Sequence, residues 1–374
     1  MHAVEPGPAW RALNVVIAGG GTGGHLFPGI AVAEAFAARN PFSRVLFVGA
    51  GRPLEIEVLA RVGFPQRTIA IEGIKGKGRW AKVRAVVKIP GALLHAGAIL
   101  ADMTADLVVG VGGYAAGPVA LAAWFKGIPV VLCEQNTVPG ITNRILLPLA
   151  KRMYVSFEDT RGKIPSSKRR FIGNPIRRQV LDATRTAADS NGRFTVLVVG
   201  GSQGARAINL AVTDGLKHLA HPERIRFVHQ TGIDGYAQVA DAYAKAGIDA
   251  EVRAFFHDMA SRYGQADLVV CRAGATTVAE LTAMGKPALL IPYPYAADNH
   301  QAHNARVLVD RGAAQMVLEE NLSGLDLARR IERLAADSEL LAAMASRSKT
   351  LGRPDAAQAV VDDCYRLLED RSCT

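Results

Sequence analysis

The feature that most constrains the fold is a strand, a glycine-rich loop and a helix, which follow one another twice in this chain. The first copy occupies residues 15–18, 19–25 and 26–39. The second copy occupies residues 194–199, 200–205 and 207–219. In this arrangement the loop N–H groups and the helix N-terminus point at one spot, which suits a phosphate. Two copies so far apart predict two similar α/β domains facing one cleft.

The first glycine loop differs from the two best-known phosphate-binding loops. No Lys-Ser/Thr pair follows its glycines, so it is not a Walker loop. His25 stands near the position where the dinucleotide fingerprint has its last glycine. For this loop alone, a tight turn without a ligand stays open as the alternative, and the second copy favours a ligand.

Composition predicts two cores and an anionic partner. The 374 residues are 49% hydrophobic and 21% charged, which suffices for two ordinary domains. The formal net charge is +10. An excess of this size indicates a nucleic acid, a membrane surface or a phosphorylated substrate as the partner.

The cysteines and the apolar runs indicate a cytoplasmic protein without a membrane span. The four cysteines match no zinc pattern and form no disulfide framework, which fits a reducing compartment. They are Cys133, Cys271, Cys364 and Cys373. Residues 1–12 lack the apolar core of a signal peptide. No run approaches the ~20 apolar residues that a spanning helix needs.

Strands that alternate with helices predict doubly wound parallel sheets, which is the α/β class. Besides the two strands of the repeat, strands are predicted at 44–49, 67–71, 106–110, 129–132, 153–155, 170–172, 226–229, 250–253, 267–271 and 286–291. The segment 173–177 marks the domain boundary, because a polar, linker-like stretch follows it and the pattern then restarts.

Polar residues follow several predicted strands, where doubly wound sheets bind their ligands. Glu134 and Asn136 follow the strand at 129–132, with capping of the next helix as the alternative. The Ser202 hydroxyl, in the second loop, can donate to a phosphate. Glu280 can accept both hydroxyls of a ribose; its alternative is a favourable interaction with the helix dipole, about 0.3–1 kcal/mol.

The segment 74–100 interleaves cations with a tryptophan and aliphatic residues, and contains no acidic residue. This composition is typical of a segment that lies on anionic lipid. An amphipathic core helix with a solvated basic face, interrupted at Pro90, is the alternative. The residues of this predicted membrane patch are Ile74, Lys75, Lys77, Arg79, Trp80, Lys82, Arg84 and Lys88. Residues 124–126 either extend the patch or pack in the core.

Seven motifs occur in the order found in the MurG family of bacterial peptidoglycan N-acetylglucosaminyltransferases, and the chain resembles this family from about residue 15 to residue 301. The motifs are residues 19–25, 112–114, 134–136, 173–177, 200–205, 271–280 and 298–301. The family belongs to glycosyltransferase family 28 and to the two-domain GT-B class. The resemblance implies an acceptor-binding, membrane-associating domain 1–176, a UDP-GlcNAc-binding domain 177–354, and a final helix (355–374) that packs back on the first domain.

The resemblance also implies the reaction. GlcNAc passes from UDP-GlcNAc to the C4 hydroxyl of undecaprenyl-diphospho-MurNAc-pentapeptide (lipid I), with inversion at the anomeric carbon, and lipid II results. We expect no cofactor and no metal, because no Asp-x-Asp motif stands at a strand end. Helix dipoles and loop N–H groups are then expected to stabilise the departing diphosphate.

Roles for individual residues follow from the same resemblance. Phe256 lies by the uracil, Glu280 holds the ribose, and Ser202 meets the diphosphate. The full set expected to contact UDP-GlcNAc is Thr22, Gly23, Gly24, Asn136, Arg177, Ser202, Phe256, Ala275, Thr276, Thr277, Val278, Ala279, Glu280 and Gln301. The set expected at the acceptor diphosphate is Gly20, Gly21, Gly112, Gly113 and Tyr114.

His25 is the leading candidate for the catalytic base, because its unperturbed pKa suits proton transfer near neutral pH. A phosphate-binding or structural histidine is the alternative reading of His25, and Glu134 is the competing base. A polyprenyl-linked acceptor stays in the bilayer. The resemblance therefore implies a peripheral protein on the cytoplasmic face of the plasma membrane, on anionic lipid, with cell-wall synthesis and division proteins as partners.

Two other kinds of function are weighed against this one. Another GT-B enzyme, such as a glycolipid glycosyltransferase or a UDP-GlcNAc epimerase, is disfavoured by the motifs at 173–177 and 298–301. A non-catalytic nucleotide-sugar sensor or a nucleic-acid-binding protein is suggested by the charge of +10. Nucleic-acid binding is disfavoured because the positive charge gathers beside aliphatic residues.

Overall fold

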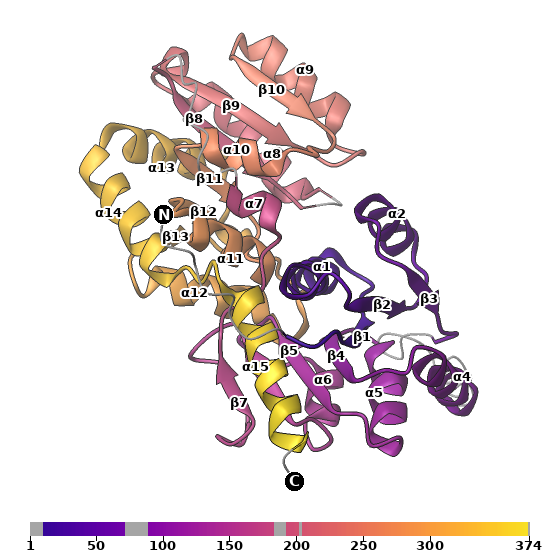
Figure 1. The fold of residues 1–374 in the computed structure, drawn as a ribbon. Coiled ribbons are helices and arrows are strands. Elements are labelled where there is room, and N and C mark those ends of the chain that lie inside the picture. Colours follow the sequence, from indigo (N-terminus) through magenta and orange to yellow (C-terminus); the bar gives the residue numbers. More distant parts are fainter. Residues whose placement is uncertain (1–9, 72–88, 183–191, 202–203, 373–374) are drawn as a thin grey trace, which may run out of the picture. The chain divides into compact units, whose positions relative to one another are not determined.

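The computed structural model describes residues 10–71, 89–182, 192–201 and 204–372 (Figure 1). The chain divides into two compact units. Unit 1 contains residues 1–135, 139–177 and 355–374, and unit 2 contains residues 136–138 and 178–354. In the part of the chain that the structure describes, no helix is both long and apolar enough to cross a membrane.

Unit 1 is built on a seven-stranded sheet in the order β3-β2-β1-β4-β5-β6-β7, and every pair of neighbours is parallel. Its strands are β1 (Asn14–Gly19), β2 (Arg44–Gly49), β3 (Gln66–Thr68), β4 (Leu107–Gly112), β5 (Val130–Glu134), β6 (Arg152–Val155) and β7 (Arg169–Phe171). Its helices are α1 (Gly23–Arg39), α2 (Pro53–Val62), α4 (Ile89–Asp102), α5 (Ala116–Phe125), α6 (Ile141–Leu146) and α15 (Ala356–Ser372). The strand order reverses between β1 and β4, which is where such sheets bind ligands.

Unit 2 repeats this plan in a six-stranded parallel sheet of order β10-β9-β8-β11-β12-β13. Its strands are β8 (Phe194–Val199), β9 (Ile225–Gln230), β10 (Ala250–Arg253), β11 (Leu268–Cys271), β12 (Ala288–Leu290) and β13 (Ala314–Met316). Its α-helices are α7 (Arg178–Asp182), α8 (Arg206–Gly215), α9 (Tyr236–Ala246), α10 (Met259–Gln265), α11 (Ala275–Met284), α12 (His300–Val309), α13 (Gly324–Ala336) and α14 (Ser338–Leu351). Short 3-10 turns are η2 (Leu216–His218), η3 (Pro222–Arg224), η4 (Ala297–Asn299) and η5 (Glu319–Asn321).

Both faces of the unit 1 sheet are buried, because successive residues of a strand point to opposite faces. Val15 and Ile17 of β1 belong to one apolar cluster, and Val16 and Ala18 belong to the other. The first cluster includes residues of α1 and α15, and the second includes residues of α4 and α5. The near-continuous apolar strands in the sequence reflect this burial on both sides.

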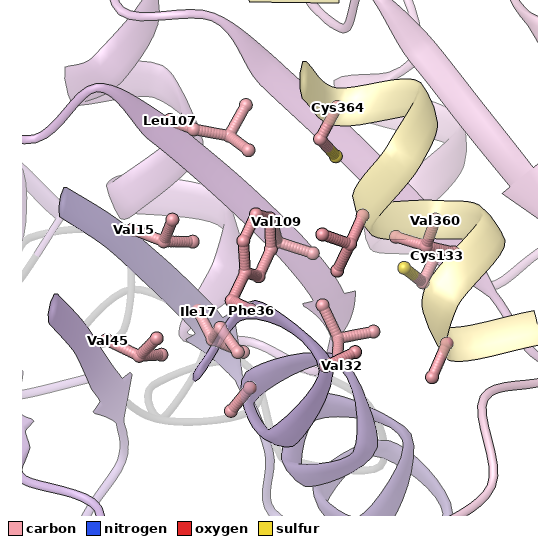
Figure 2. Close-up of a cluster of buried hydrophobic side chains, with 14 of the residues drawn as sticks. Val15, Ile17, Val32, Phe36, Val45, Leu107, Val109, Cys133, Val360 and Cys364 are labelled. Carbon is pink, nitrogen blue, oxygen red and sulfur yellow. The ribbon is translucent and has the colours of Figure 1, made fainter. Parts of the chain in front are cut away.

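The C-terminal helix α15 is part of the first core. Figure 2 shows Val360 and Cys364 of α15 in one cluster with Phe36 and Val32 of α1 and with Val109 of β4. The Tyr154 hydroxyl on β6 donates to Asp363 Oδ2 at 3.0 Å. A segment more than 200 positions away in the sequence therefore completes the core of unit 1.

The α/β class and the doubly wound parallel sheets are confirmed, and some elements differ from expectation. Helix α1 begins at Gly23, so three loop residues form its first turn. The strand expected at 67–71 ends at Thr68. Residues 311–354 carried no prediction and form β13, α13 and α14. In the described part of α4, Pro90 stands in the first turn and does not interrupt the helix.

Tyr365 on α15 is expected to stabilise unit 1 strongly. Its ring is 1% exposed, lies 4.9 Å from that of Trp10, and its hydroxyl donates to the Arg11 carbonyl at 3.0 Å. We expect Tyr365→Ala to lower the free energy of unfolding by about 3–5 kcal/mol. Urea unfolding measures this change. Glu369→Ala, at an exposed position of the same helix, is the control, and an equal loss in both variants would contradict the prediction.

Candidate functional site

The two glycine loops of unit 1 interlock at the ends of β1 and β4. The Gly20 N–H donates to the Gly112 carbonyl at 3.2 Å. A Cβ atom on Gly19 would lie 2.1 Å from the Gly112 oxygen, and one on Gly113 would lie 2.6 Å from the Gly20 oxygen. All four residues have positive φ. At Gly19 and Gly113 only glycine fits, because the two backbones approach without room for a side chain.

His25 lies against this junction, in the first turn of α1. A Cβ on Gly112 would be 2.8 Å from His25 Cδ2, so the imidazole occupies the space that this glycine leaves open. His25 Nδ1 is 3.2 Å from Thr22 Oγ1. When Nδ1 carries the proton and donates to Thr22 Oγ1, Nε2 is the unprotonated nitrogen, which is the form that a base requires.

Two residues that the sequence analysis did not single out support the first loop from α2. Arg52 Nη1 donates to the Gly21 carbonyl at 3.0 Å. Glu55 is 2% exposed, and its Oε2 accepts from Gly51 N at 2.9 Å. Its Oε1 would lie 2.7 Å from a Cβ on Gly20. The only sequence signal for this support is a carboxylate in the first turn of a short helix.

Glu134 is buried, with 2% exposure, at the end of β5. Its Oε2 accepts from the Gly140 N–H at 2.9 Å and from Asn143 Nδ2 at 2.8 Å. Gly140 is the residue before α6, so these contacts match the capping alternative.

Arg177 is the last residue of the predicted motif 173–177. Its guanidinium lies 4.1 Å from the centre of the Phe27 ring.

The second glycine loop closes on the end of β9. A Cβ on Gly204, where φ is +74°, would lie 2.3 Å from the Thr231 oxygen. The Asn209 Nδ2 on α8 donates to the same oxygen at 2.9 Å. The predicted phosphate contact Ser202 lies outside the described residues. In the described part of this loop, Gly204 thus packs directly against the Thr231 backbone, as Gly19 of the first loop packs against the Gly112 backbone.

A buried polar network lies under this second loop. His229 is fully buried, with Nε2 3.1 Å from Asn209 Oδ1 and Nδ1 3.2 Å from the Tyr243 hydroxyl. Burial lowers the pKa of His229 to about 3, because the charged form loses its hydration. The sequence analysis did not single out His229, because a histidine within an apolar strand cannot be distinguished by its pattern from any other strand residue.

The predicted ribose and uracil contacts lie on neighbouring elements of unit 2. Glu280, in the second turn of α11, is 8% exposed, and its Oε2 accepts from the Tyr263 hydroxyl at 3.3 Å. Phe256 is 4% exposed, and the Arg262 guanidinium lies 4.7 Å from the centre of its ring. Residues 275–279 form the first turn and the start of the second turn of the same helix, α11, after Gly274 in extended conformation.

Asn304 joins Asn136 to the start of α11. Asn304 Oδ1 accepts from the Thr137 N–H and hydroxyl, each at 3.1 Å. Its Nδ2 donates to Asn136 Oδ1 and to the Ala273 carbonyl, each at 3.2 Å. All four bonding positions of the buried amide are used. Unit 2 thereby holds Asn136 beside the residues that precede α11.

The loop before α12 holds two non-glycine residues in left-handed conformation, Asp298 with φ 52° and Asn299 with φ 51°. Such backbone costs energy and is concentrated at functional sites. Gln301 follows, and its Oε1 accepts from the Tyr293 N–H at 3.0 Å. Within the described ranges, no three His, Cys, Asp or Glu side chains are grouped as metal ligands.

The predicted site residues that the structure describes divide between the two units. The set in unit 1 is Gly20, Gly21, Thr22, Gly23, Gly24, His25, Gly112, Gly113, Tyr114, Glu134 and Arg177. The set in unit 2 is Asn136, Phe256, Ala275, Thr276, Thr277, Val278, Ala279, Glu280 and Gln301. The eight residues of the predicted membrane patch, from Ile74 to Lys88, lie outside the described residues. Trp124 and Phe125, which the sequence analysis weighed as an extension of this patch, are exposed, at 48% and 66%.

Models of two protein domains match this chain. The glycosyltransferase family 28 N-terminal domain matches residues 15–155, and the family 28 C-terminal domain matches residues 195–360. The chain belongs to glycosyltransferase family 28. Within family 28 it belongs with the MurG enzymes, as the following relatives show.

One curated relative, from Myxococcus xanthus, is 46% identical over 95% of this chain and 93% of its own length. A second, from Geobacter metallireducens, is 45% identical over 94% of this chain and 98% of its own. Both are named UDP-N-acetylglucosamine–N-acetylmuramyl-(pentapeptide) pyrophosphoryl-undecaprenol N-acetylglucosamine transferase. The crystal structure of Acinetobacter baumannii MurG is 32% identical, covers 93% of this chain and 98% of its own, and has a TM-score of 0.75.

More distant structures share the fold alone. A UDP-GlcNAc 2-epimerase from Neisseria meningitidis has a TM-score of 0.66 at 15% identity, over 94% of this chain and 99% of its own. This likeness accounts for the epimerase alternative, because the same two-unit GT-B architecture carries different reactions. The family 28 relatives favour the transferase over that alternative.

Burial of His229 makes the stability of this family 28 chain depend on pH. The unfolded histidine binds a proton below about pH 6.5, whereas the folded one stays neutral down to about pH 3. Stability is therefore fully present above about pH 6.5 and is lost as the pH falls, by about 1.4 kcal/mol per pH unit. We expect His229→Gln to lack this part of the slope between pH 6 and pH 4. Urea unfolding across this range measures it.

The matched control is His257→Gln, at an exposed histidine of the same unit. It is expected to keep the wild-type slope. If the stability of His229→Gln falls with pH as steeply as that of the wild type, the prediction is contradicted, because groups other than His229 would then account for the whole pH dependence.

Proposed function

We propose that this chain transfers GlcNAc from UDP-GlcNAc to the C4 hydroxyl of lipid I, with inversion, and so makes lipid II for peptidoglycan. The observation that carries this proposal is 46% identity along 95% of the chain to a relative with that printed activity. The repeated glycine loop supports it, since the reaction joins two diphosphate-bearing substrates and each unit offers one strand–glycine loop–helix of the appropriate kind.

Unit 2 binds the donor in this proposal. The N-terminus of α11, formed by residues 275–279, and the second glycine loop with Ser202 receive the diphosphate. Glu280 accepts the ribose hydroxyls, and its fixed contact with Tyr263 supports this role. The Phe256 N–H already donates to Gln230, so the Phe256 carbonyl is the group that pairs with the uracil N3–H. The family resemblance assigns the remaining nucleotide and sugar contacts to Asn136 and Gln301, and also to Arg177, which belongs to unit 1.

Unit 1 binds the acceptor. Gly20, Gly21 and the Gly112–Gly113 turn with Tyr114 receive its diphosphate, and Thr22 to Gly24 approach the donor sugar. His25 takes the proton from the C4 hydroxyl as the oxygen attacks the anomeric carbon and UDP leaves. Its contact with Thr22 Oγ1 supports the tautomer that this step requires. Glu134 is the weaker candidate, because two hydrogen bonds already engage its buried Oε2.

Transfer of labelled GlcNAc from UDP-GlcNAc to a short-chain lipid I analogue tests the proposal. We expect wild-type activity, a fall in kcat of about 10²–10⁴-fold for His25→Ala, and mainly a raised donor KM for Glu280→Ala. A wild-type protein that binds UDP-GlcNAc and transfers nothing supports the sensor alternative instead.

Glu134→Gln is the companion variant for the base. It keeps an oxygen that can accept from Gly140 and removes the charge. If His25→Ala retains most of its kcat while Glu134→Gln loses it, Glu134 is the base and His25 is not.

The chain is further proposed to lie on the cytoplasmic face of the plasma membrane, on anionic lipid, where cell-wall synthesis and division proteins are its expected partners. The acceptor requires this location, since its polyprenyl chain stays in the bilayer. Exposed apolar side chains support it: Leu94 on α4 is 77% exposed, and Trp124 and Phe125 are exposed on α5, which packs on α4. Aromatic side chains favour the membrane interface, and the positive segment 74–88 continues the same chain into α4.

Co-sedimentation with vesicles tests this surface. We expect the wild type to bind vesicles that contain phosphatidylglycerol better than vesicles of phosphatidylcholine alone. The double variant Trp124→Ser/Phe125→Ser is expected to bind several-fold more weakly, because apolar area is lost from the interface. Leu325→Ser, at an exposed position of α13 in unit 2, is the control. Equal binding by all three proteins would contradict the proposal.

A further inference from the structure

Gln230, the last residue of β9, connects two loops that the sequence separates by about 50 residues. The side chain is 2% exposed. Its Nε2 donates to the Gly201 carbonyl at 3.1 Å, in the second glycine loop. Its Oε1 accepts from the Phe256 N–H at 2.9 Å, in the segment after β10. One amide group thus bonds to the loop on each side of its strand.

The surrounding backbone fixes where Gln230 stands. Strands β8, β9 and β10 are neighbours in the sheet, and Figure 1 shows them side by side. Just beyond Gln230, the Thr231 N–H donates to the Arg253 carbonyl at 3.0 Å and the Gly232 N–H to the Ala254 carbonyl at 3.0 Å. The ends of three strands are therefore held together, and Gln230 reaches outward from the middle strand to both flanking loops.

The two bonds require an amide. A glutamate accepts from Phe256 as well as a glutamine does, but its ionised form has no hydrogen to donate to Gly201. A methionine of similar length offers neither bond and leaves two buried backbone groups without their partner, which is costly. Substitution by glutamate therefore removes only the bond to Gly201, whereas substitution by methionine removes both bonds.

We propose that Gln230 is a positioning residue for the donor nucleotide, which sets the Gly201 loop and the Phe256 segment at the spacing of a pyrimidine nucleoside diphosphate. This inference rests on the proposed function, in which the loop binds the diphosphate and the segment binds the base. Gln230 acts through these two backbones. Gln230 thereby links the loop that binds the diphosphate to the segment that binds the base. The preference for UDP over a ligand without the diphosphate, such as uridine, depends on this link.

Binding of UDP and of uridine, measured by ligand-detected NMR titration without any transfer reaction, tests the inference. For Gln230→Glu at pH 7.5 we expect UDP affinity to fall about tenfold or more, because the carboxylate repels the Gly201 carbonyl. Uridine affinity is expected to stay within about twofold of the wild type, because Phe256 keeps its acceptor. For Gln230→Met, both affinities are expected to fall.

A pH series separates positioning from a general loss of structure. As the pH falls, the introduced carboxyl takes up a proton and can donate to Gly201 again. UDP affinity of the Gln230→Glu protein relative to the wild type is therefore expected to recover toward pH 5. Gln238→Glu, at an exposed position of α9, is the control, and is expected to match the wild type at every pH.

Three results overturn the inference. In the first, Gln230→Glu binds UDP as tightly as the wild type does. In the second, it loses UDP and uridine in equal measure with no recovery at low pH, which indicates a structural role only. In the third, the wild type itself binds no UDP, and the proposed function falls together with the inference.

Discussion

Close approach of backbone to backbone at the strand ends is the constraint on which both candidate sites depend. In unit 1 the positions of Gly19 and Gly113 leave no room for a Cβ beside the facing carbonyl oxygens, and in unit 2 Gly204 is held against Thr231 in the same way. Because no side chain separates these segments, their N–H groups stay near the helix N-termini. A loop built in this way binds an anion with main-chain groups, whose positions the sheet itself fixes.

The sequence predicted those parts of the molecule that depend on local chemistry. Apolar strands, glycine loops and helices follow from periodicity and from the conformations open to glycine, so the two parallel sheets were expected. Residues that act through long-range contacts gave no such signal. Gln230, Asn304 and Glu55 are ordinary polar residues in the sequence, and their importance appears only when the fold brings a distant carbonyl or N–H within hydrogen-bonding distance. Glu134 was singled out correctly as a strand-end carboxylate, yet its neighbours determine whether it caps a helix or meets a substrate.

Buried amides and a neutral histidine hold unit 2 together beneath its loops. Each of these side chains forms hydrogen bonds to two different partners. Because hydrogen bonds are directional, they specify one arrangement of the loops more strictly than apolar packing does. The same low-dielectric surroundings make each bond costly to lose. The energetic consequence is that the loops proposed to bind the donor and the core below them form one cooperative structure, in which a ligand that orders the loops also stabilises the strands.

The return of α15 to unit 1 has a consequence for how the protein is made on the ribosome. Val360, Val361, Cys364 and Tyr365 belong to the core that β1 and α1 begin to build, but they emerge only after all of unit 2 has been synthesised. The first unit must wait, with part of one face of its sheet uncovered, while the second has every strand and helix that it requires. Domains usually fold in order from the N-terminus during synthesis. Here we expect unit 2 to be able to finish folding before unit 1. Synthesis of α15 is therefore the event that completes the core of unit 1.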